Sequence, residues 1–405
     1  DPELSRGLGD VYKRQGYPSP YSTRGSLATS TKIFQTSGGT ILNSNAVSNF
    51  YANPDLTPEI HKELELGIEA KFLKNRVGVD VSLFTKDSED LIIDLDLDNS
   101  TGYTQSTVNS ASINNKGVEA ILNVIPVQSR DFTWDVTASF SLLRSEVISI
   151  ADGIDQIYVG GYVGRGNIAI PGLPYGILEG ELIRRDYGSL DGTDHTQVHW
   201  DDRTGYTPIV NANGGYQFLG YGVIGNPQPD YVYGVTNTLS YKWATLRVQF
   251  DSQVGGDVFS TTNSTLLGRG ILQETDFDRF VPVVTNGLSA DGTPNTTQTT
   301  ANAHYWPNTG VFYDENSIYD ASVMRLREVS LSFVAPKSFL NGTPFGNASL
   351  TLSAQNIWHY AWNTPSGTNF DPEVISYGAG SNARGFDEMT GPTAKKYGAT
   401  LSLTF

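Results

Sequence analysis

The sequence predicts an all-β protein, an antiparallel transmembrane β-barrel, and three observations lead to this fold class. Apolar and polar side chains alternate with period two in many segments, and the last, 397–405, does so without interruption. No run reaches the roughly 18 apolar residues of a membrane-crossing helix, and only helices and closed barrels cross a bilayer. The links between segments are either short or long, as in a barrel with tight turns at one rim and large loops at the other.

The composition agrees with strands and turns and excludes several other classes. Hydrophobic residues make up only 38% of the 405 residues, while Gly reaches 42, which argues against a thick helical core. The net charge of -16 argues against nucleic acid as a partner, because phosphate contacts need clustered Lys and Arg. With Cys at 0, disulfide scaffolds and thiolate metal sites are excluded.

The first part of the chain is expected to lie outside the barrel. No charged segment followed by an apolar core is visible at its start, so no signal peptide is predicted. The string VYKRQ at 11–15 is what translation of a common sequencing adapter gives, and we expect 1–15 to be a non-native sequencing scar. Residues 16–58 are rich in Ser, Thr, Gly, Pro and Asn, which predicts an irregular extracellular loop. The barrel is expected over 59–405.

Nine segments show the alternation clearly, and each is expected to be one strand. They are 63–72, 77–83, 118–124, 132–142, 231–241, 244–250, 322–333, 348–354 and 397–405. In the cleanest, 132–142, Trp134 and Phe140 share one face while Asp135 and Ser141 share the other. Strand lengths of about 9 to 12 residues match a tilted crossing of the bilayer.

The links between these strands set a direction for the chain. Short links are expected at 73–76, 125–131, 242–243 and 335–346, and long links at 93–113, 143–230, 256–318 and 359–392. The first and the last strand then run towards the short-turn rim, so the number of strands is odd. Weaker candidates near 175–183 and 216–224 leave the total at about nine to eleven, and we expect these two to form a hairpin inside a large outer loop.

Several short blocks of the chain carry a resemblance to one protein family, in which they occur in the same order. They are 53–59 (NPDLTPE), 115–119 (NKGVE), 224–227 (IGNP), 320–333 (DASVMRLREVSLSF), 356–358 (NIW), 370–373 (FDPE) and the terminal Phe405. Together they resemble the SusC/RagA-like group of TonB-dependent outer-membrane transporters of Bacteroidetes. The resemblance covers about 53–405, and the stretch 320–333 is the most specific part of it.

This resemblance implies a fold and a function. The family fold is a roughly 22-stranded barrel around a folded plug, so this chain would supply the carboxy-terminal part of the barrel. It would not insert or transport alone, because a partial barrel leaves two unpaired edges. The implied activity is outer-membrane import of oligosaccharides or peptides, not an enzymatic reaction, and it needs no cofactor. Implied partners are a SusD-like surface lipoprotein, outer-membrane lipid, the oligosaccharide or peptide ligand, and the TonB complex through the missing N-terminal plug.

Charged residues on the polar strand faces are expected to line a wet lumen, because charges are costly in contact with lipid. Glu119 and Asp135 are such residues, and in the family they would face the plug. Arg325 and Arg327 alternate on one strand, in phase opposite to Met324. Two interpretations of this pair stay open: contact with plug carboxylates or ligand, or salt bridges inside the barrel.

Aromatic residues of the outer loops are the candidate ligand contacts, because sugar rings stack on flat apolar faces with polar edges. The candidates are Trp306, Tyr305, Trp200, Trp358, Tyr158 and Tyr162. Trp358 could equally belong to a girdle of aromatics at the membrane interface.

Two other interpretations stay open. A smaller, self-closing barrel hydrolase would place its active site near His195. His195 and His199 are four apart, a spacing that two metal ligands can have on a helix, and Asp194 is nearby. No metal site is expected there, because neither a helix nor an HExxH base is predicted. A soluble β-sandwich that binds carbohydrate would instead pack its apolar strand faces against each other.

Overall fold

The computed structural model describes most of the chain. The described residues are 27–29, 34–35, 37–39, 41–42, 45–162, 164–186, 205–308, 313–364, 368, 370–373, 383–391 and 393–405. The expected sequencing scar, 1–15, lies outside them. So do Trp200 and the His195 region proposed for a hydrolase.

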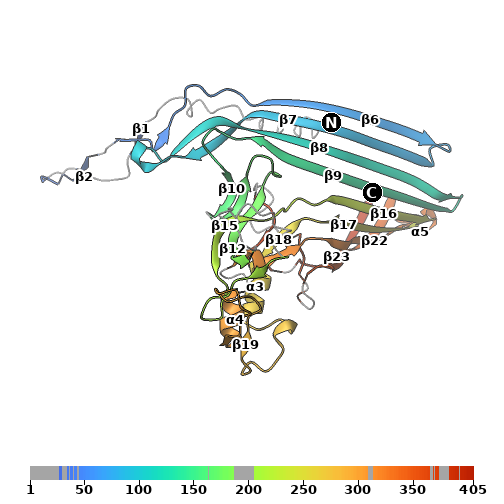
Figure 1. Ribbon diagram of the computed structural model, residues 1–405. Helices are drawn as coiled ribbons and strands as arrows, with labels where there is room; N and C mark the ends of the chain where they lie inside the picture. Colours follow the sequence, from blue (N-terminus) through green and yellow to red (C-terminus); the bar gives the residue numbers. More distant parts are fainter. Residues whose placement is uncertain are drawn as a thin grey trace.

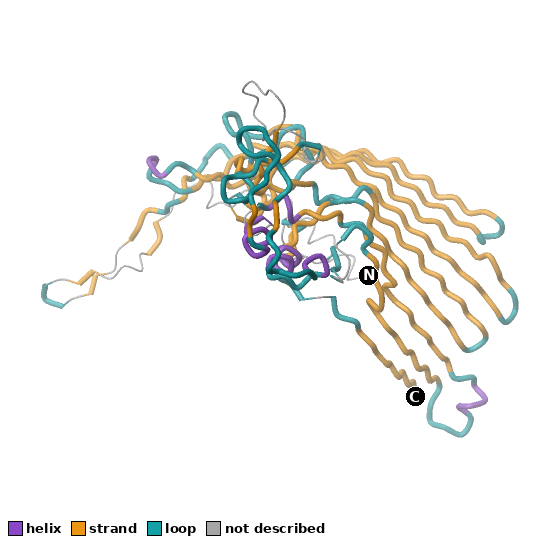
Figure 2. Tube along the Cα trace, turned by 60° about the horizontal axis from the view of Figure 1, so that its bottom comes forward, coloured by secondary structure: helices purple, strands orange, loops and turns teal. Residues whose placement is uncertain are grey.

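One curved antiparallel sheet forms the wall of the molecule, and nine long strands of the described chain build it (Figure 1). In order across the sheet they are β6 (Ile60–Phe72), β7 (Val77–Asp96), β8 (Gln105–Gln128), β9 (Phe132–Ser149), β16 (Tyr231–Tyr241), β17 (Ala244–Val254), β22 (Val323–Val334), β23 (Asn347–Tyr360) and β25 (Lys396–Thr404). The short strand β5 (Phe50–Tyr51) pairs parallel to β8. Figure 2 shows the nine strands side by side as a single layer that bends along its width and does not close on itself.

The strands agree with the sequence prediction in number and order. Each alternating segment lies within one long strand or extends at most one residue beyond it, and neighbours in the sheet follow one another in the chain, so the predicted odd count is confirmed. Three short links have their predicted bounds, 73–76, 242–243 and 335–346. The fourth is shorter than predicted, 129–131 instead of 125–131, because β8 continues to Gln128.

The strand register joins the apolar residues into continuous rows on one side, which we call the outer face. Leu66 pairs with Leu83, which pairs with Val118, which pairs with Leu142. These residues have no second sheet over them, and Leu66 keeps 67% of its surface exposed. The β-sandwich alternative is therefore wrong, since it requires these rows to be buried against another layer. A single layer with an exposed apolar face suits a wall set in lipid.

The region 93–113 differs from the prediction of a long loop. It consists of the extended ends of β7 and β8, joined by the link 97–104, which holds the 3-10 turn η1 (Asn99–Thr101). The pairing of the two strands shifts between Ser88 and Leu91, and Asp90 between them has a φ of 57°. Such a bulge breaks the period-two pattern, which is why the alternation there did not indicate strand.

The three long links fold together at one end of the sheet, and we call their described parts, within 150–230, 255–322 and 361–395, the cap. Figure 1 shows the cap beside one end of the long strands, with the helix α5 (Lys337–Leu340) at the opposite end. A four-stranded sheet of the cap consists of β10 (Ile157–Tyr162), β11 (Arg165–Ala169), β12 (Ile177–Ile183) and β15 (Phe218–Gly225). The weaker segments near 175–183 and 216–224 thus pair with each other outside the main wall, as predicted. They are part of a four-stranded sheet and not a simple hairpin, because β13 and β14 lie between them in the chain.

The cap has its own apolar core. A second small sheet contains β18 (Asp257–Ser260), β21 (Ile318–Asp320) and β24 (Phe386–Asp387). Phe259 and Phe386 from this sheet pack with Leu178 and Leu182 of β12, and all four are fully buried. Residues from all three long links therefore meet in one cluster.

The remaining elements are short. They are β1 (Leu27–Thr29), β2 (Phe34–Gln35), β3 (Ile41–Leu42), β4 (Asn45–Val47), β13 (Arg185–Asp186), β14 (Thr207–Pro208), β19 (Val283–Val284), β20 (Gln298–Thr299), the helices α3 (Thr261–Gly268) and α4 (Ala301–Asn308), and the 3-10 turns η3 (Gln273–Thr275) and η4 (Asp314–Ser317). Within the described chain, none of the helices has the length and apolar character needed to cross a bilayer.

The outer-face assignment leads to a test on two adjacent residues. Leu83→Arg would place a charge on the outer face of β7 and is expected to destabilise the inserted sheet by about 2–4 kcal/mol. Ser82→Arg is the control, because Ser82 lies on the opposite face, beside Glu119 in the register and hydrogen-bonded to Glu65. The measurement is the fraction of folded receptor in isolated outer membranes. Equal folded fractions for the two variants would contradict the assignment.

Candidate functional site

A polar cavity of about 560 Å³ lies against the inner face of the sheet, opposite the apolar rows. Strand register assembles it: Asp80, Ile121, Ser139 and Gly234 form one row across β7, β8, β9 and β16. The row continues through Asp251 of β17 to Arg325 of β22. The polar residues that line the cavity are Asp80, Ser82, Glu119, Ser139, Ser141, Gln249, Asp251, Ser252, Gln253, Arg325 and Glu373.

A β-bulge at Arg327 shapes one wall of this cavity. Leu326 pairs with Phe250 and Glu328 with Gln249, so Arg327 has no register partner on β17. The pairing with β23 also shifts at this point. The bulge reverses the phase of β22: before it the even-numbered Leu326 is on the outer face, and after it the odd-numbered Val329 is.

Arg327 joins the wall to the cap through two carboxylates. It donates through Nε and Nη2 to the two oxygens of Asp251, at 2.7 and 2.9 Å. It also donates through Nη1 and Nη2 to Glu373, at 2.9 and 2.8 Å. A guanidinium that makes two forked contacts fixes the relative position of both partners.

Arg325 makes the more deeply buried connection, with only 4% of its surface exposed. Its Nη2 donates to Asp371 Oδ1 at 2.6 Å, and its Nε lies 3.4 Å from Glu373 Oε2. Asp371 also accepts from the Glu373 amide at 3.1 Å and from the Thr393 hydroxyl at 2.5 Å. We call Asp251, Arg325, Arg327, Asp371 and Glu373 the lumen network.

The charge state of Asp371 follows from these contacts. Burial by itself would raise the pKa of its carboxyl, but hydrogen bonds and the charge of Arg325 hold that pKa below its ordinary value of 3.8. Because the pKa is lowered by folding, the ionised group stabilises the fold at pH above 3.8, and this contribution is lost as pH falls through the lower value.

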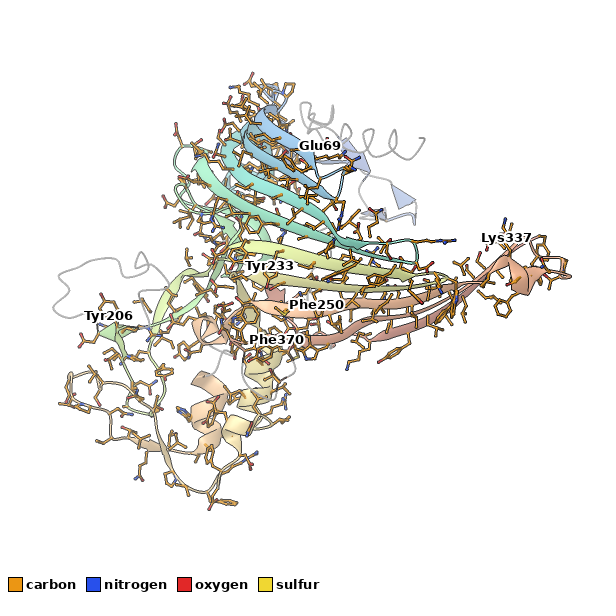
Figure 3. All side chains as sticks on the ribbon, turned by 90° about the vertical axis from the view of Figure 1, so that its right-hand side faces the viewer. Glu69, Tyr206, Tyr233, Phe250, Lys337 and Phe370 are labelled. Carbon is orange, nitrogen blue, oxygen red and sulfur yellow. The ribbon has the colours of Figure 1, made fainter. Side chains whose placement is uncertain are left out.

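The apolar residue next to this network packs inside the cap and joins two of its long links. Phe370 packs with Val258 and Ala321 in a buried cluster. In Figure 3, Phe370 lies beside the sheet in the region of Phe250 rather than at its far end. The contact with the inner face is made by Asp371 and Glu373, which bond to Arg325 and Arg327, and Glu373 also lines the cavity.

The predicted lumen residues lie on the inner face of the sheet. Glu119 and Arg325 line the cavity, while Asp135 lies outside it and pairs with Thr238 of β16. The open interpretation of Arg325 and Arg327 as salt-bridged residues agrees with the lumen network. Contact of any of these residues with a plug or ligand stays a prediction.

The predicted aromatic ligand residues are scattered. Trp358 pairs with Leu326 on the outer face and stacks on Tyr360 at 6.4 Å, which is the placement expected of a girdle residue. Tyr158 donates its hydroxyl to the buried Glu179 at 2.5 Å. Tyr305 and Trp306 lie together on α4, where the Arg269 guanidinium is 5.2 Å from the Trp306 ring centroid.

The other two aromatics cannot be placed. Tyr162 ends β10 with a side chain outside the described ones, and Trp200 lies outside the described residues. Among the side chains that the structure describes, no group of three His, Asp or Glu could hold a metal ion.

Sequence reasoning missed the acidic half of the lumen network. Asp371 and Glu373 lie in a long link without periodicity, so no local pattern marks them as partners of the two arginines. One signal was available: two arginines on the polar phase of a buried strand need carboxylate partners, and Asp251 has the matching phase on the neighbouring strand.

A lipid-facing sheet, a polar lumen and a cap of long loops define the class of an outer-membrane barrel protein. Residues 8–251, more than half of the chain, match the family model for the TonB dependent receptor-like β-barrel. The chain belongs to this family, and the protein is located in the outer membrane.

Several TonB-dependent receptors are similar to this chain. TonB-dependent receptor P3 of Formosa agariphila is 26% identical over an alignment of 424 residues, which covers 97% of this chain and 39% of that protein. TonB-dependent receptor SusC of Bacteroides thetaiotaomicron is 22% identical over 66% of this chain and 25% of its own length. The chain thus spans about two fifths or less of these relatives.

A solved structure shows the same fold. The structure of the RagAB peptide transporter matches with a TM-score of 0.66 at 19% identity, over 95% of this chain and 39% of that chain. The sequence-based resemblance to the SusC/RagA-like group is therefore confirmed.

Proposed function

We propose that the intact protein imports a nutrient, an oligosaccharide or a peptide, across the outer membrane. The observation that carries the proposal is the polar cavity on the inner face of a wall whose outer face is apolar. Hydroxyl, amide and carboxylate groups there can exchange hydrogen bonds with a hydrated ligand. All of these groups are on strands of the wall except the carboxylate of Glu373, which belongs to the cap. Relatives named TonB-dependent receptor and RagAB peptide transporter support the same function.

The charges in the cavity favour one kind of ligand. Its lining contains four carboxylates, those of Asp80, Glu119, Asp251 and Glu373, and the guanidinium of Arg325. Arg327 pairs with two of them, Asp251 and Glu373, so four carboxylates stand against two guanidinium groups. An acidic cavity with low-dielectric walls repels anions and attracts cations. The proposed ligand is therefore a neutral oligosaccharide or a basic peptide rather than an acidic one.

The partners follow from the same proposal. Import needs an energy source, which we assign to the TonB complex acting through a plug inside the barrel. A SusD-like surface lipoprotein would bind over the cap, where Phe280, Ile271 and Val281 expose apolar surface. Tyr305 and Trp306 of α4 are the proposed cap contacts for a ligand on its way to the lumen.

Transport assays on cells can test this function. Ser141→Trp would fill the cavity and is expected to reduce uptake of a labelled ligand about tenfold, because a ligand and the indole ring compete for one space. Ser402→Trp is the control, since Ser402 of β25 pairs with Ser349 of β23 and lies outside the cavity. Neutral oligosaccharides and basic and acidic peptides would be compared at equal surface abundance of receptor. If Ser141→Trp leaves the uptake rate unchanged, the cavity is not the path of the ligand.

A further inference from the structure

A second cavity lies at the opposite end of the sheet from the cap and on its outer face. It measures about 340 Å³, and its lining is almost entirely apolar. Phe333, Ala348, Leu350 and Leu401 form its floor on β22, β23 and β25. Trp243 and Phe339 belong to the short links at its edge. We call it the rim groove.

The short link 335–346 builds the rim groove by turning back against the sheet. The Val334 amide donates to the Trp243 carbonyl at 2.8 Å, and the Ala335 amide donates to the Ala348 carbonyl at 2.8 Å. Pro336 then starts α5, which presents Phe339 with 76% of its surface exposed. Because this face meets lipid, the exposed rings extend the apolar surface instead of facing water.

The four short links carry a charge opposite to that of the whole chain. They contain Lys74, Arg76, Arg130, Lys242 and Lys337, against the single acid Asp131. The whole chain has a net charge of -16. Lys337 follows Pro336 and Lys242 precedes Trp243, so each lysine adjoins a residue of the groove lining. In Figure 3, Lys337 lies at the tip of the sheet, far from the cap.

We propose that the rim groove is a binding site for a phospholipid with a negatively charged headgroup. One acyl chain lies in the groove between Trp243 and Phe339, and the phosphate is held by Lys337 and Lys242. The apolar lining fits a hydrocarbon chain and offers few hydrogen-bonding groups to a polar ligand. The cationic links explain the choice of headgroup, because juxtamembrane Lys and Arg attract anionic lipid. This site is independent of the transported nutrient.

Fluorescence quenching by brominated lipid tests the proposal. The intact receptor would be placed in phosphatidylcholine nanodiscs that contain either dibrominated phosphatidylglycerol or dibrominated phosphatidylcholine. The emission of Trp243, obtained by difference from Trp243→Phe, is expected to be quenched more strongly by the phosphatidylglycerol. Lys337→Gln is expected to weaken this preference about fivefold, and Lys242→Gln likewise.

Controls separate a specific site from the general lipid shell. Ala348→Phe fills the groove and should abolish the extra quenching, while Ala354→Phe on the same strand and face, outside the groove, should leave it intact. Lys396→Gln removes a lysine at the other end of the sheet and should not change the preference. Equal quenching by the two lipids, or a preference that survives loss of both rim lysines, would overturn the proposal. The lysine variants change exposed side chains, so this result does not depend on whether Ala348→Phe folds.

Discussion

Arg325→Met is expected to release the segment around Asp371 from the barrel wall. The substitution leaves the Asp371 carboxylate buried without its guanidinium, and breaking a buried pair in this way costs about 3–5 kcal/mol. These 405 residues contain no cysteine, so a thiol introduced here can report the release when labelling is compared with that of the receptor without it. Pro372→Cys places it in the buried part of the segment. Its labelling by a maleimide should accelerate about a hundredfold or more in the Arg325→Met background.

The matched control for this experiment is Arg247→Met. Arg247 lies on the neighbouring strand β17, pairs with Ser330 in the register and is exposed. Its loss should leave the labelling rate unchanged, because surface charges contribute little to stability. If both variants label equally fast, the lumen network does not hold the cap segment on the wall.

Phe259→Ala is expected to disorganise the cap while leaving the sheet in place. Phe259 is fully buried and meets the Phe386 ring at a centroid distance of 5.7 Å. The Arg165 guanidinium lies 5.2 Å from the centre of the same ring. Removing a buried phenyl ring costs about 3–5 kcal/mol through lost burial and the cavity that remains. Because this cluster joins all three long links, its loss should open each of them.

Proteolysis of intact cells can measure this effect, since the cap is expected on the outside. The cap of Phe259→Ala should be cleaved quickly, and the strands should remain protected by the membrane. Phe280→Ala provides the control, because Phe280 is 97% exposed and its removal creates no cavity. Equal resistance of the two variants to protease would show that the cluster does not hold the cap together.

The wall of the protein was predictable from the sequence because its signal is local. Alternation in 132–142 identifies β9 and its two faces without knowledge of any partner strand. Where the local signal breaks, prediction failed. The bulge next to Asp90 hid the extended ends of β7 and β8, and the residues near Arg327 change phase within one strand.

The candidate site was predictable only in its strand residues. Glu119 and Arg325 follow from polar phase, and the structure places both on the cavity. The cap partners Asp371 and Glu373 lie in a link whose path depends on packing between distant segments. For Trp358 the girdle alternative fits its place on the outer face, because residue type alone does not tell a ligand contact from a girdle residue.

The nine strands, their order and the separation of an apolar from a polar face could be predicted from the sequence, because side-chain alternation is a property of each strand alone. The tertiary structure decided which polar groups meet. Arg325 reaches Asp371 across 46 positions of the chain, and Arg327 reaches Asp251 across 76. Such contacts depend on sheet register and on the folding of the long links, and neither leaves a local pattern in the sequence.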